Sequence, residues 1–181
     1  MTAQIQVRRD TAAAWTSANP VLKAGEQGYE TDTGNYKMGD GASVWTALGY
    51  NAQPTPATYT PVWTQNLSDI DPTVNYAKYS VENKVVKGAV KLTAVNAGTT
   101  GYEILVTTPV AASVTGLIVG TGWFLDQSTG DQYKVVVYLS TVNAFAFVRA
   151  DTLTSTGIGV DPNIPVAAGD VINFKFEYEV A

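Results

Sequence analysis

The chain has 181 residues, enough for one large domain or for one small and one medium domain, and 45% hydrophobic against 15% charged residues exclude a disordered chain. The net charge of −5 and only 11 scattered Lys and Arg residues, with Arg8-Arg9 the only basic pair, argue against nucleic-acid binding. The chain has no Cys and no His, so it forms no disulfide and lacks the commonest general base and metal ligand.

The rest of the composition favours β-structure. The chain contains 23 Thr and 23 Val, which fit a pleated strand better than a helix, and 16 Gly and 8 Pro supply turns. No apolar run reaches the roughly 18 residues of a membrane-spanning helix, so we expect no membrane insertion. The start, MTAQIQVRRD, lacks the apolar core and cleavage site of a signal peptide, which predicts synthesis in a cytoplasm.

The first 50 residues are typical of a small unit with one helix. Residues 5–9 alternate as a short strand, and Asp10 or Thr11 can then cap a helical turn that is built on the alanines that follow. Asn19-Pro20 ends this helix, because the residue before a proline avoids helical dihedral angles.

Two short strands follow in the same unit. Residues 29–31 and 36–38 form a hairpin through a turn at 32–35, and Gly39-Asp40-Gly41 makes another sharp turn. So small a unit buries little surface by itself. Its large aromatic side chains either share one small core or are completed by neighbouring copies of the chain; they are Trp15, Tyr29, Tyr36 and Trp45.

A polar stretch over residues 51–58 marks a domain boundary. It contains Pro54 and Pro56, which favour an extended, semi-rigid backbone, and it shows no helical or strand period. We therefore predict an N-terminal module over 1–50, a linker over 51–58 and a second domain over 59–181.

The second domain has longer strands. Residues 172–180 alternate between apolar and polar, strands over 131–140 and 143–149 can pair, and strands over 84–95 and 102–108 make a further pair. Several strands separated by turns predict an antiparallel β-sandwich or jelly roll. The whole chain is therefore expected to be all-β, with one short helix near its start.

No catalytic motif is recognisable in the sequence. Gly-x-Ser-x-Gly is absent, and without His or Cys a nucleophile lacks its usual base. Asp69 with Asp71, and Asp126 with Asp131, could suit glycoside hydrolysis or calcium binding. Both pairs adjoin turns, where Asp ordinarily accepts hydrogen bonds from nearby backbone N–H groups. We interpret them as structural and assign no catalytic, cofactor-binding or metal-binding residue; we expect no enzyme.

Glycan binding is a separate hypothesis, because sugar rings stack on aromatic faces. The four candidate side chains are Trp15, Trp45, Trp63 and Trp123. Tryptophan more often anchors a small core than faces solvent, so none of them is singled out as a sugar contact.

Residues 4–50 resemble the N-terminal module of phage tail-fibre and tropism-determinant proteins. Asp10 departs from the glycine that is frequent in that family. The resemblance rests on Arg8-Arg9, Thr11, Trp15, Asn19-Pro20, Leu22, Gly25-Glu26, Gly28, Glu30-Thr31-Asp32-Thr33, Lys37, Gly39-Asp40-Gly41, Trp45, Leu48 and Tyr50.

Residues 59–181 resemble a β-sandwich at the C-terminal end of small phage structural proteins. The matching stretches are Tyr59 to Thr64, Thr108 to Ala112, and Gly169 to Glu179.

Together the two resemblances imply a virion protein. In the first family the module forms a small trimeric unit, which implies a homotrimer that also contacts other virion proteins. One hypothesis is a tail-fibre or receptor-binding protein that contacts the host surface, including a surface glycan. The alternative is a head decoration protein that stabilises the capsid, which the lack of a fibre shaft favours.

Overall fold

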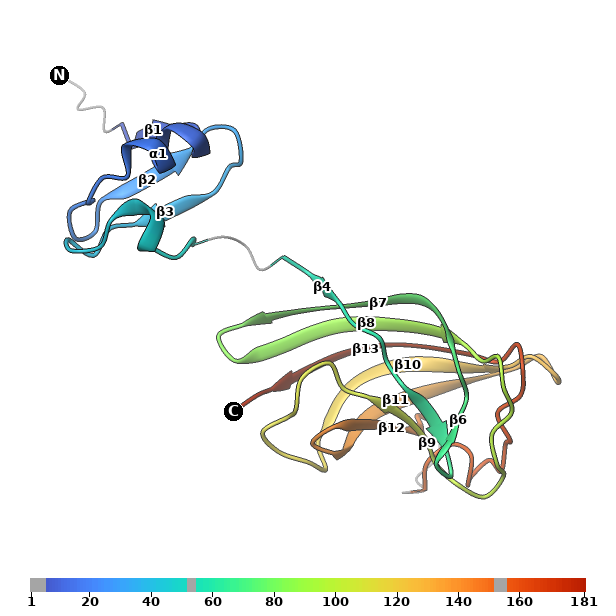
Figure 1. Cartoon of the computed structure of the whole chain (residues 1–181). Helices are drawn as coiled ribbons and strands as arrows, with labels where there is room; N and C mark the ends of the chain where they lie inside the picture. The colour runs from blue at the N-terminus through green and yellow to red at the C-terminus, as the bar shows by residue number, and fades with distance from the viewer. Residues whose placement is uncertain (1–5, 52–54, 152–155) are drawn as a thin grey trace. The chain divides into compact units, whose positions relative to one another are not determined.

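The computed structural model describes residues 6–51, 55–151 and 156–181. It divides into two compact units, Met1–Thr55 and Pro56–Ala181 (Figure 1). The prediction of an all-β chain with one short helix near its start is confirmed. Among the described residues no helix is long and apolar enough to cross a bilayer.

The N-terminal unit holds a three-stranded sheet and the helix. Its elements are β1 (Arg8–Asp10), α1 (Ala12–Ala18), β2 (Gln27–Glu30), β3 (Tyr36–Met38) and the 3₁₀ turn η1 (Trp45–Ala47). β2 lies in the middle, parallel to β1 and antiparallel to β3. The hairpin of β2 and β3 is the predicted one, whereas the first strand is shifted toward Asp10 and the start of its predicted range, Ile5, lies outside the described residues.

The two ends of α1 follow from its flanking residues. Thr11 is the N-cap, and its hydroxyl accepts a hydrogen bond from the Ala14 N–H at 3.2 Å. Asn19 ends the helix in the left-handed conformation, with φ of 40°, and Pro20 follows. The predicted cap and stop are therefore confirmed, with Thr11 rather than Asp10 at the N-cap.

A three-residue core holds the N-terminal unit together. Trp15, Leu22 and Trp45 are buried, and the two indole rings stack with their centroids 4.3 Å apart. The Trp15 Nε1–H donates to the Tyr29 carbonyl at 2.9 Å. Gly28 lies against both rings, since a Cβ atom there would come within 2.5 Å of Trp45. The unit thus does form a small shared core around its two tryptophans.

The C-terminal unit is one ten-stranded antiparallel sheet (Figure 1). Its order is β4-β7-β8-β13-β10-β11-β12-β9-β5-β6, so its edges are two strands of two residues each. Ala57 and Thr58, expected in the linker, form β4 and pair with β7; residues 52–54 of that linker lie outside the described residues. The strands are β4 (Ala57–Thr58), β5 (Trp63–Gln65), β6 (Ser68–Asp69), β7 (Thr73–Glu82), β8 (Val85–Thr93), β9 (Ile104–Thr107), β10 (Ile118–Asp126), β11 (Asp131–Thr141), β12 (Ala144–Arg149) and β13 (Val171–Glu179).

Two of the predicted strand relations are right and one is wrong. β11 pairs with β12, and β13 has the alternating burial that its sequence indicates. The predicted pair of 84–95 with 102–108 does not form, because β8 lies between β7 and β13 while β9 lies between β12 and β5. The turn Asn83-Lys84 explains the difference: both residues have positive φ, 49° and 67°, as a two-residue hairpin requires.

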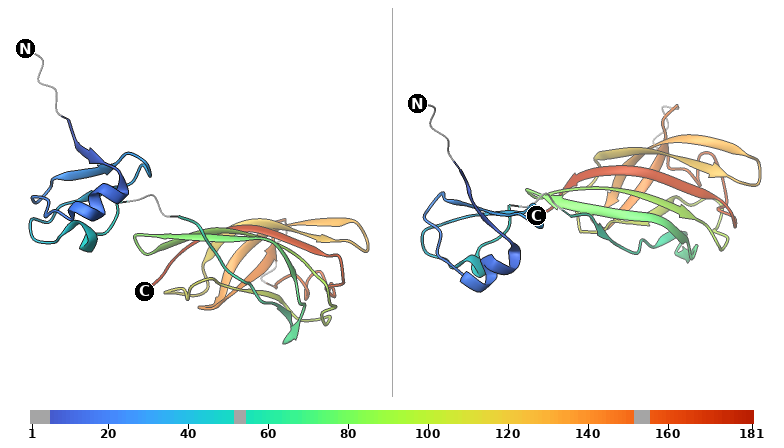
Figure 2. Two further views of the ribbon diagram at one scale, coloured as in Figure 1. Left: turned by 45° about the horizontal axis from the view of Figure 1, so that its top comes forward. Right: turned by 90° about the horizontal axis from the view of Figure 1, so that it is seen from above.

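The sheet curls so that it closes over its own core (Figure 2). The Phe145 ring of β12 lies 5.4 Å from Phe174 and 4.8 Å from Phe176 of β13, measured between centroids. β10 and β11 separate these strands in the sheet order, so only curvature brings the rings together. The expected sandwich-like packing is therefore built from two halves of one continuous sheet.

Gln65 connects the loops at one end of this core. Its side chain is buried, and its amide nitrogen donates to the carbonyls of Tyr102 and Ile164, both at 2.9 Å. Its amide oxygen accepts from the Val166 N–H at 3.0 Å. Three backbone groups that would otherwise lie unpaired in the interior are thereby satisfied.

Candidate functional site

One carboxylate of each predicted acidic pair accepts hydrogen bonds within a turn. An Asp69 oxygen accepts from the Asp71 N–H at 2.9 Å. One Asp126 oxygen accepts from the Ser128 N–H and hydroxyl and from the Thr129 N–H, at 2.9, 2.6 and 3.3 Å. Asp131 lies at the start of β11, where its N–H donates to the Thr129 hydroxyl. Hydrogen bonds within the turns account for Asp69 and Asp126.

A further buried acid, Asp170, lies close to Asp126 and was missed as a candidate. Burial raises the pKa of Asp170, and the neighbouring charge of Asp126 raises it further. Burial also raises the pKa of Asp126, but the hydrogen bonds from Ser128 and Thr129 outweigh it and hold that pKa below its ordinary value. Opposed pKa shifts can mark an acid and a base. Here the Asp170 carboxylate is occupied by the N–H groups of Gln127 and Ala167, which supports a structural role.

Three of the four candidate tryptophans lie in cores. Trp15 and Trp45 belong to the core of the N-terminal unit, and Trp63 of β5 is fully buried in the core of the C-terminal unit. Trp123 on β10 differs, because it is partly exposed and lies opposite Lys134 of β11 on the face that points away from the core. Among the described residues, no group of three acidic side chains is placed to hold a metal ion.

A polar cluster around the buried side chains of Glu30 and Lys37 closes the N-terminal unit. Glu30 accepts hydrogen bonds from the Tyr50 hydroxyl at 2.6 Å and from Thr33. The Lys37 ammonium donates to the Trp45 carbonyl at 2.9 Å and lies 4.2 Å from the centre of the Tyr50 ring. The hydrogen bond to Glu30 raises the pKa of Tyr50. Because every polar group named in this cluster has a partner, we assign the cluster a structural role in stabilising the N-terminal unit.

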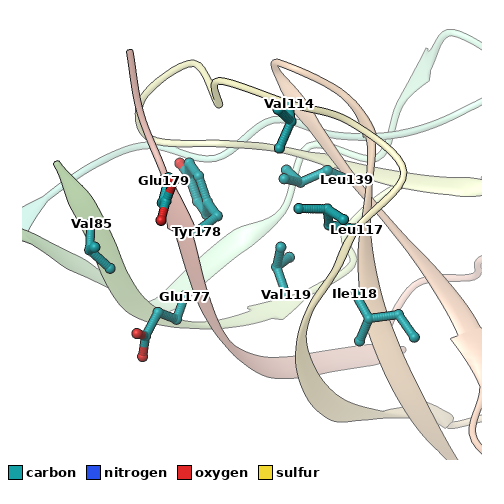
Figure 3. Close-up of a pocket in the computed structure, with 9 residues that line it drawn as sticks. All are labelled: Val85, Val114, Leu117, Ile118, Val119, Leu139, Glu177, Tyr178 and Glu179. Atoms are coloured by element: carbon teal, nitrogen blue, oxygen red, sulfur yellow. The ribbon is translucent and has the colours of Figure 1, made fainter.

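An apolar pocket of about 340 Å³ lies where β10, β11 and β13 meet the loop over residues 113–117 (Figure 3). Val114, Leu117 and Leu139 gather on one side of it, and Val85 and the glutamates of β13 lie on the other. The Gly116 N–H donates to the Leu139 carbonyl at 2.7 Å, which holds the loop against β11.

Side chains at the rim of this pocket are unusually exposed for their type. Leu117 is 52% exposed and Ile118 is 70% exposed. Adjacent exposed aliphatic side chains suit contact with another protein surface. The sequence signal was weak, since Leu117-Ile118 is merely a short apolar pair within a turn-rich segment, and our sequence interpretation missed it.

The comparisons with known proteins concern the N-terminal unit first. Residues 5–43 match the family model of the major tropism determinant N-terminal domain. The match contains the capped helix, the β2–β3 hairpin and the turn at Gly39-Asp40-Gly41, and it confirms the resemblance on which the sequence interpretation rests.

One phage protein is also similar over a short stretch. It is described as a hyaluronoglucosaminidase from Streptococcus pyogenes phage H4489A and is 39% identical to this chain over 51 residues. The stretch covers 28% of this chain and only 14% of that protein. No solved structure matches the chain significantly.

These likenesses support a phage tail or receptor-binding protein and a component of the virion. The β-rich fold after the N-terminal unit is confirmed, whereas the likeness of residues 59–181 to phage β-sandwich proteins stays a prediction.

Proposed function

We propose that this chain is a tail-associated receptor-binding or fibre protein of a phage virion. The N-terminal unit attaches it to other virion proteins, and the C-terminal unit presents the surface that contacts the host. The observation that carries this proposal is the match of residues 5–43 to a tropism determinant N-terminal domain.

The proposal includes a homotrimer. Among the described residues of the N-terminal unit only three apolar side chains are buried, and the C-terminal unit exposes Leu117 and Ile118 beside an apolar pocket. A closed trimer would cover such surface symmetrically. We expect native mass spectrometry at micromolar concentration to give three times the mass of 19.2 kDa, and Ile118→Glu to weaken the assembly. A monomer at every concentration would rule the trimer out.

We propose that the protein binds its target and does not turn it over. The acidic candidates Asp69, Asp126 and Asp170 are occupied by backbone N–H groups of turns. The similar protein named hyaluronoglucosaminidase keeps the question open, although this chain matches a small part of it. Incubating purified protein with hyaluronan and with host polysaccharide, and measuring new reducing ends, should give no more than buffer alone.

The decisive experiment is a phage that lacks this protein. We expect such particles to lose host adsorption while their capsids survive heat and low salt as the parent does. Normal adsorption with a fragile shell would instead identify a head decoration protein. Antibody labelling of parent virions shows whether the protein is part of the particle and whether it lies on the tail or on the head.

A further inference from the structure

The outward face of the ten-stranded sheet collects lysines that look scattered in the sequence. Alternation places these lysines outside, because each has a buried neighbour such as Ala77, Val90, Phe174 or Val135. Five of the chain's 11 Lys and Arg residues lie here, all of them exposed: Lys78, Lys87, Lys91, Lys134 and Lys175.

Strand register aligns several of these side chains into one row across the sheet. Successive cross-strand neighbours on β7, β8, β13, β10 and β11 are Tyr76, Lys91, Asn173, Trp123 and Lys134. We call these five residues the aromatic–lysine row. At the usual strand spacing the row is about 19 Å long.

The side chains of the row are accessible. Tyr76 is 47% exposed, Trp123 is partly exposed, and both lysines are exposed. Two shallow hollows adjoin the row and share Thr121: one is lined by Trp123 and Lys134, the other by Lys87 and Lys175. Their volumes are about 410 and 340 Å³.

The lysines of this face outnumber its glutamates by five to three. Among the described residues, Lys87 is the one lysine of the face with an ion-pair partner, Glu177 at 3.6 Å. Glu82, Glu177 and Glu179 of this face lie toward the end of the sheet away from the row, whereas Asp131 and Asp151 line a hollow together with Lys134. A basic surface therefore persists on a chain whose net charge is −5.

We propose that the aromatic–lysine row binds an acidic polysaccharide, whose sugar rings stack on Tyr76 and Trp123 and whose carboxylate or sulfate groups contact Lys91 and Lys134. The amide of Asn173, between the two, can bond a sugar hydroxyl. This inference rests on the proposed receptor-binding function and names the chemical class of the receptor.

The spacing of the charges favours a polysaccharide over a nucleic acid. Lys91 and Lys134 are three strands apart, about 14 Å, whereas duplex DNA carries one charge per about 1.7 Å. Arginine, the usual partner of phosphate and guanine, is absent from the five positions of the row. Lysines that alternate with aromatic rings suit a polymer whose anionic groups alternate with the apolar faces of its sugar rings.

The test measures binding of purified full-length chain to immobilised polygalacturonate, hyaluronan and dextran sulfate. Fully methyl-esterified polygalacturonate and neutral dextran are the uncharged counterparts, and duplex DNA is the competing polyanion. We expect binding to at least one acidic polysaccharide and to neither neutral polymer. No binding to any of the three, or tighter binding to DNA, would overturn the proposal.

Variants separate the row from general charge attraction. Lys91→Gln with Lys134→Gln should weaken binding about tenfold, and Trp123→Ala should also weaken it. Arg9→Gln with Lys23→Gln removes the same charge from the N-terminal unit and should leave binding unchanged. Equal losses in both double variants, or full binding by a folded Trp123→Ala protein, would contradict the row. Because purified protein is used, this outcome is independent of where the protein lies in the virion.

Discussion

At the scale of the residue, single polar side chains stabilise both units by accepting or donating several hydrogen bonds. Gln65 forms hydrogen bonds with three backbone groups inside the C-terminal unit. Gly98 and Gly159 leave room for its side chain, because a Cβ atom would lie 2.2 Å from the amide oxygen at Gly98 and 2.6 Å from the amide nitrogen at Gly159. Asp40 has a comparable role at the surface of the N-terminal unit, where it accepts from the Ser43 hydroxyl and from two backbone N–H groups.

We expect that replacing the amide of Gln65 by a carboxylate destabilises the C-terminal unit. Gln65→Glu keeps the shape but sets an acceptor against the carbonyls of Tyr102 and Ile164, whereas Gln65→Met leaves three groups unpaired. We expect Gln65→Met to lower the free energy of unfolding by about 2–4 kcal/mol and Gln65→Glu to lower it at least as much. Urea unfolding measures both, with the exposed Gln132→Glu as the control. Equal stability of Gln65→Glu and the parent would contradict the hydrogen-bond assignment.

Asp40 is expected to titrate well below an ordinary aspartate. Hydrogen bonds from the Ser43 side chain and from the Ser43 and Ala42 N–H groups lower the pKa of Asp40 from 3.8 to about 2. A lowered pKa means that its stabilising contribution is present above about pH 4 and is lost as the pH falls through about 2. An NMR titration should give that midpoint, and Ser43→Ala should raise it. A midpoint near 4 in the parent would show that the turn does not hold the charge.

At the scale of the element, the N-terminal sheet and helix depend on one pair of stacked rings. Trp15 comes from α1 and Trp45 from η1, so their contact joins two elements that the three-stranded sheet alone does not connect. Leu22 is the one other apolar side chain buried beside them among residues 6–51, so neither ring has a substitute.

Trp45→Ala is therefore expected to unfold the N-terminal unit and leave the C-terminal unit folded. Removing a buried tryptophan costs about 3–5 kcal/mol, which is of the order of the whole stability of so small a unit. Two-dimensional NMR should show loss of dispersion for residues 6–51 alone. Trp123→Ala, at a partly exposed position of the other unit, is the matched control and should leave those signals in place.

The sequence predicts elements well where the signal lies within one segment. The alternation of residues 172–180 and the capping of α1 by Thr11 each depend on a few neighbouring side chains, and both are confirmed. The wrong pairing of 84–95 with 102–108 arose because the Asn83-Lys84 turn carries no glycine. The aromatic–lysine row could not be predicted, since it requires the register of five strands that come from distant parts of the sequence.

At the scale of the whole molecule, the chain consists of two compact units, Met1–Thr55 and Pro56–Ala181. Each has its own buried cluster of apolar side chains. Such a division predicts independent folding.

Residues 56–181 are expected to fold when expressed alone. Their core contains Trp63, Phe124, Phe145, Phe147 and Phe174, all within the same unit. Circular dichroism should show a β spectrum with a cooperative thermal transition close to that of the full chain. An aggregated or unstructured product would show that the second unit needs the first.

The edges of the large sheet bear on how copies of this protein could associate. An edge with many free N–H and C=O groups can recruit a foreign strand, and β4 pairs with only Lys78 and Tyr79 of the ten-residue β7. Much of β7 therefore forms an edge of the sheet in the described part of the chain. Association along β7 would extend the sheet by added strands, whereas the proposed trimer would use side-chain surfaces such as the rim at Leu117 and Ile118 and leave the sheet unchanged.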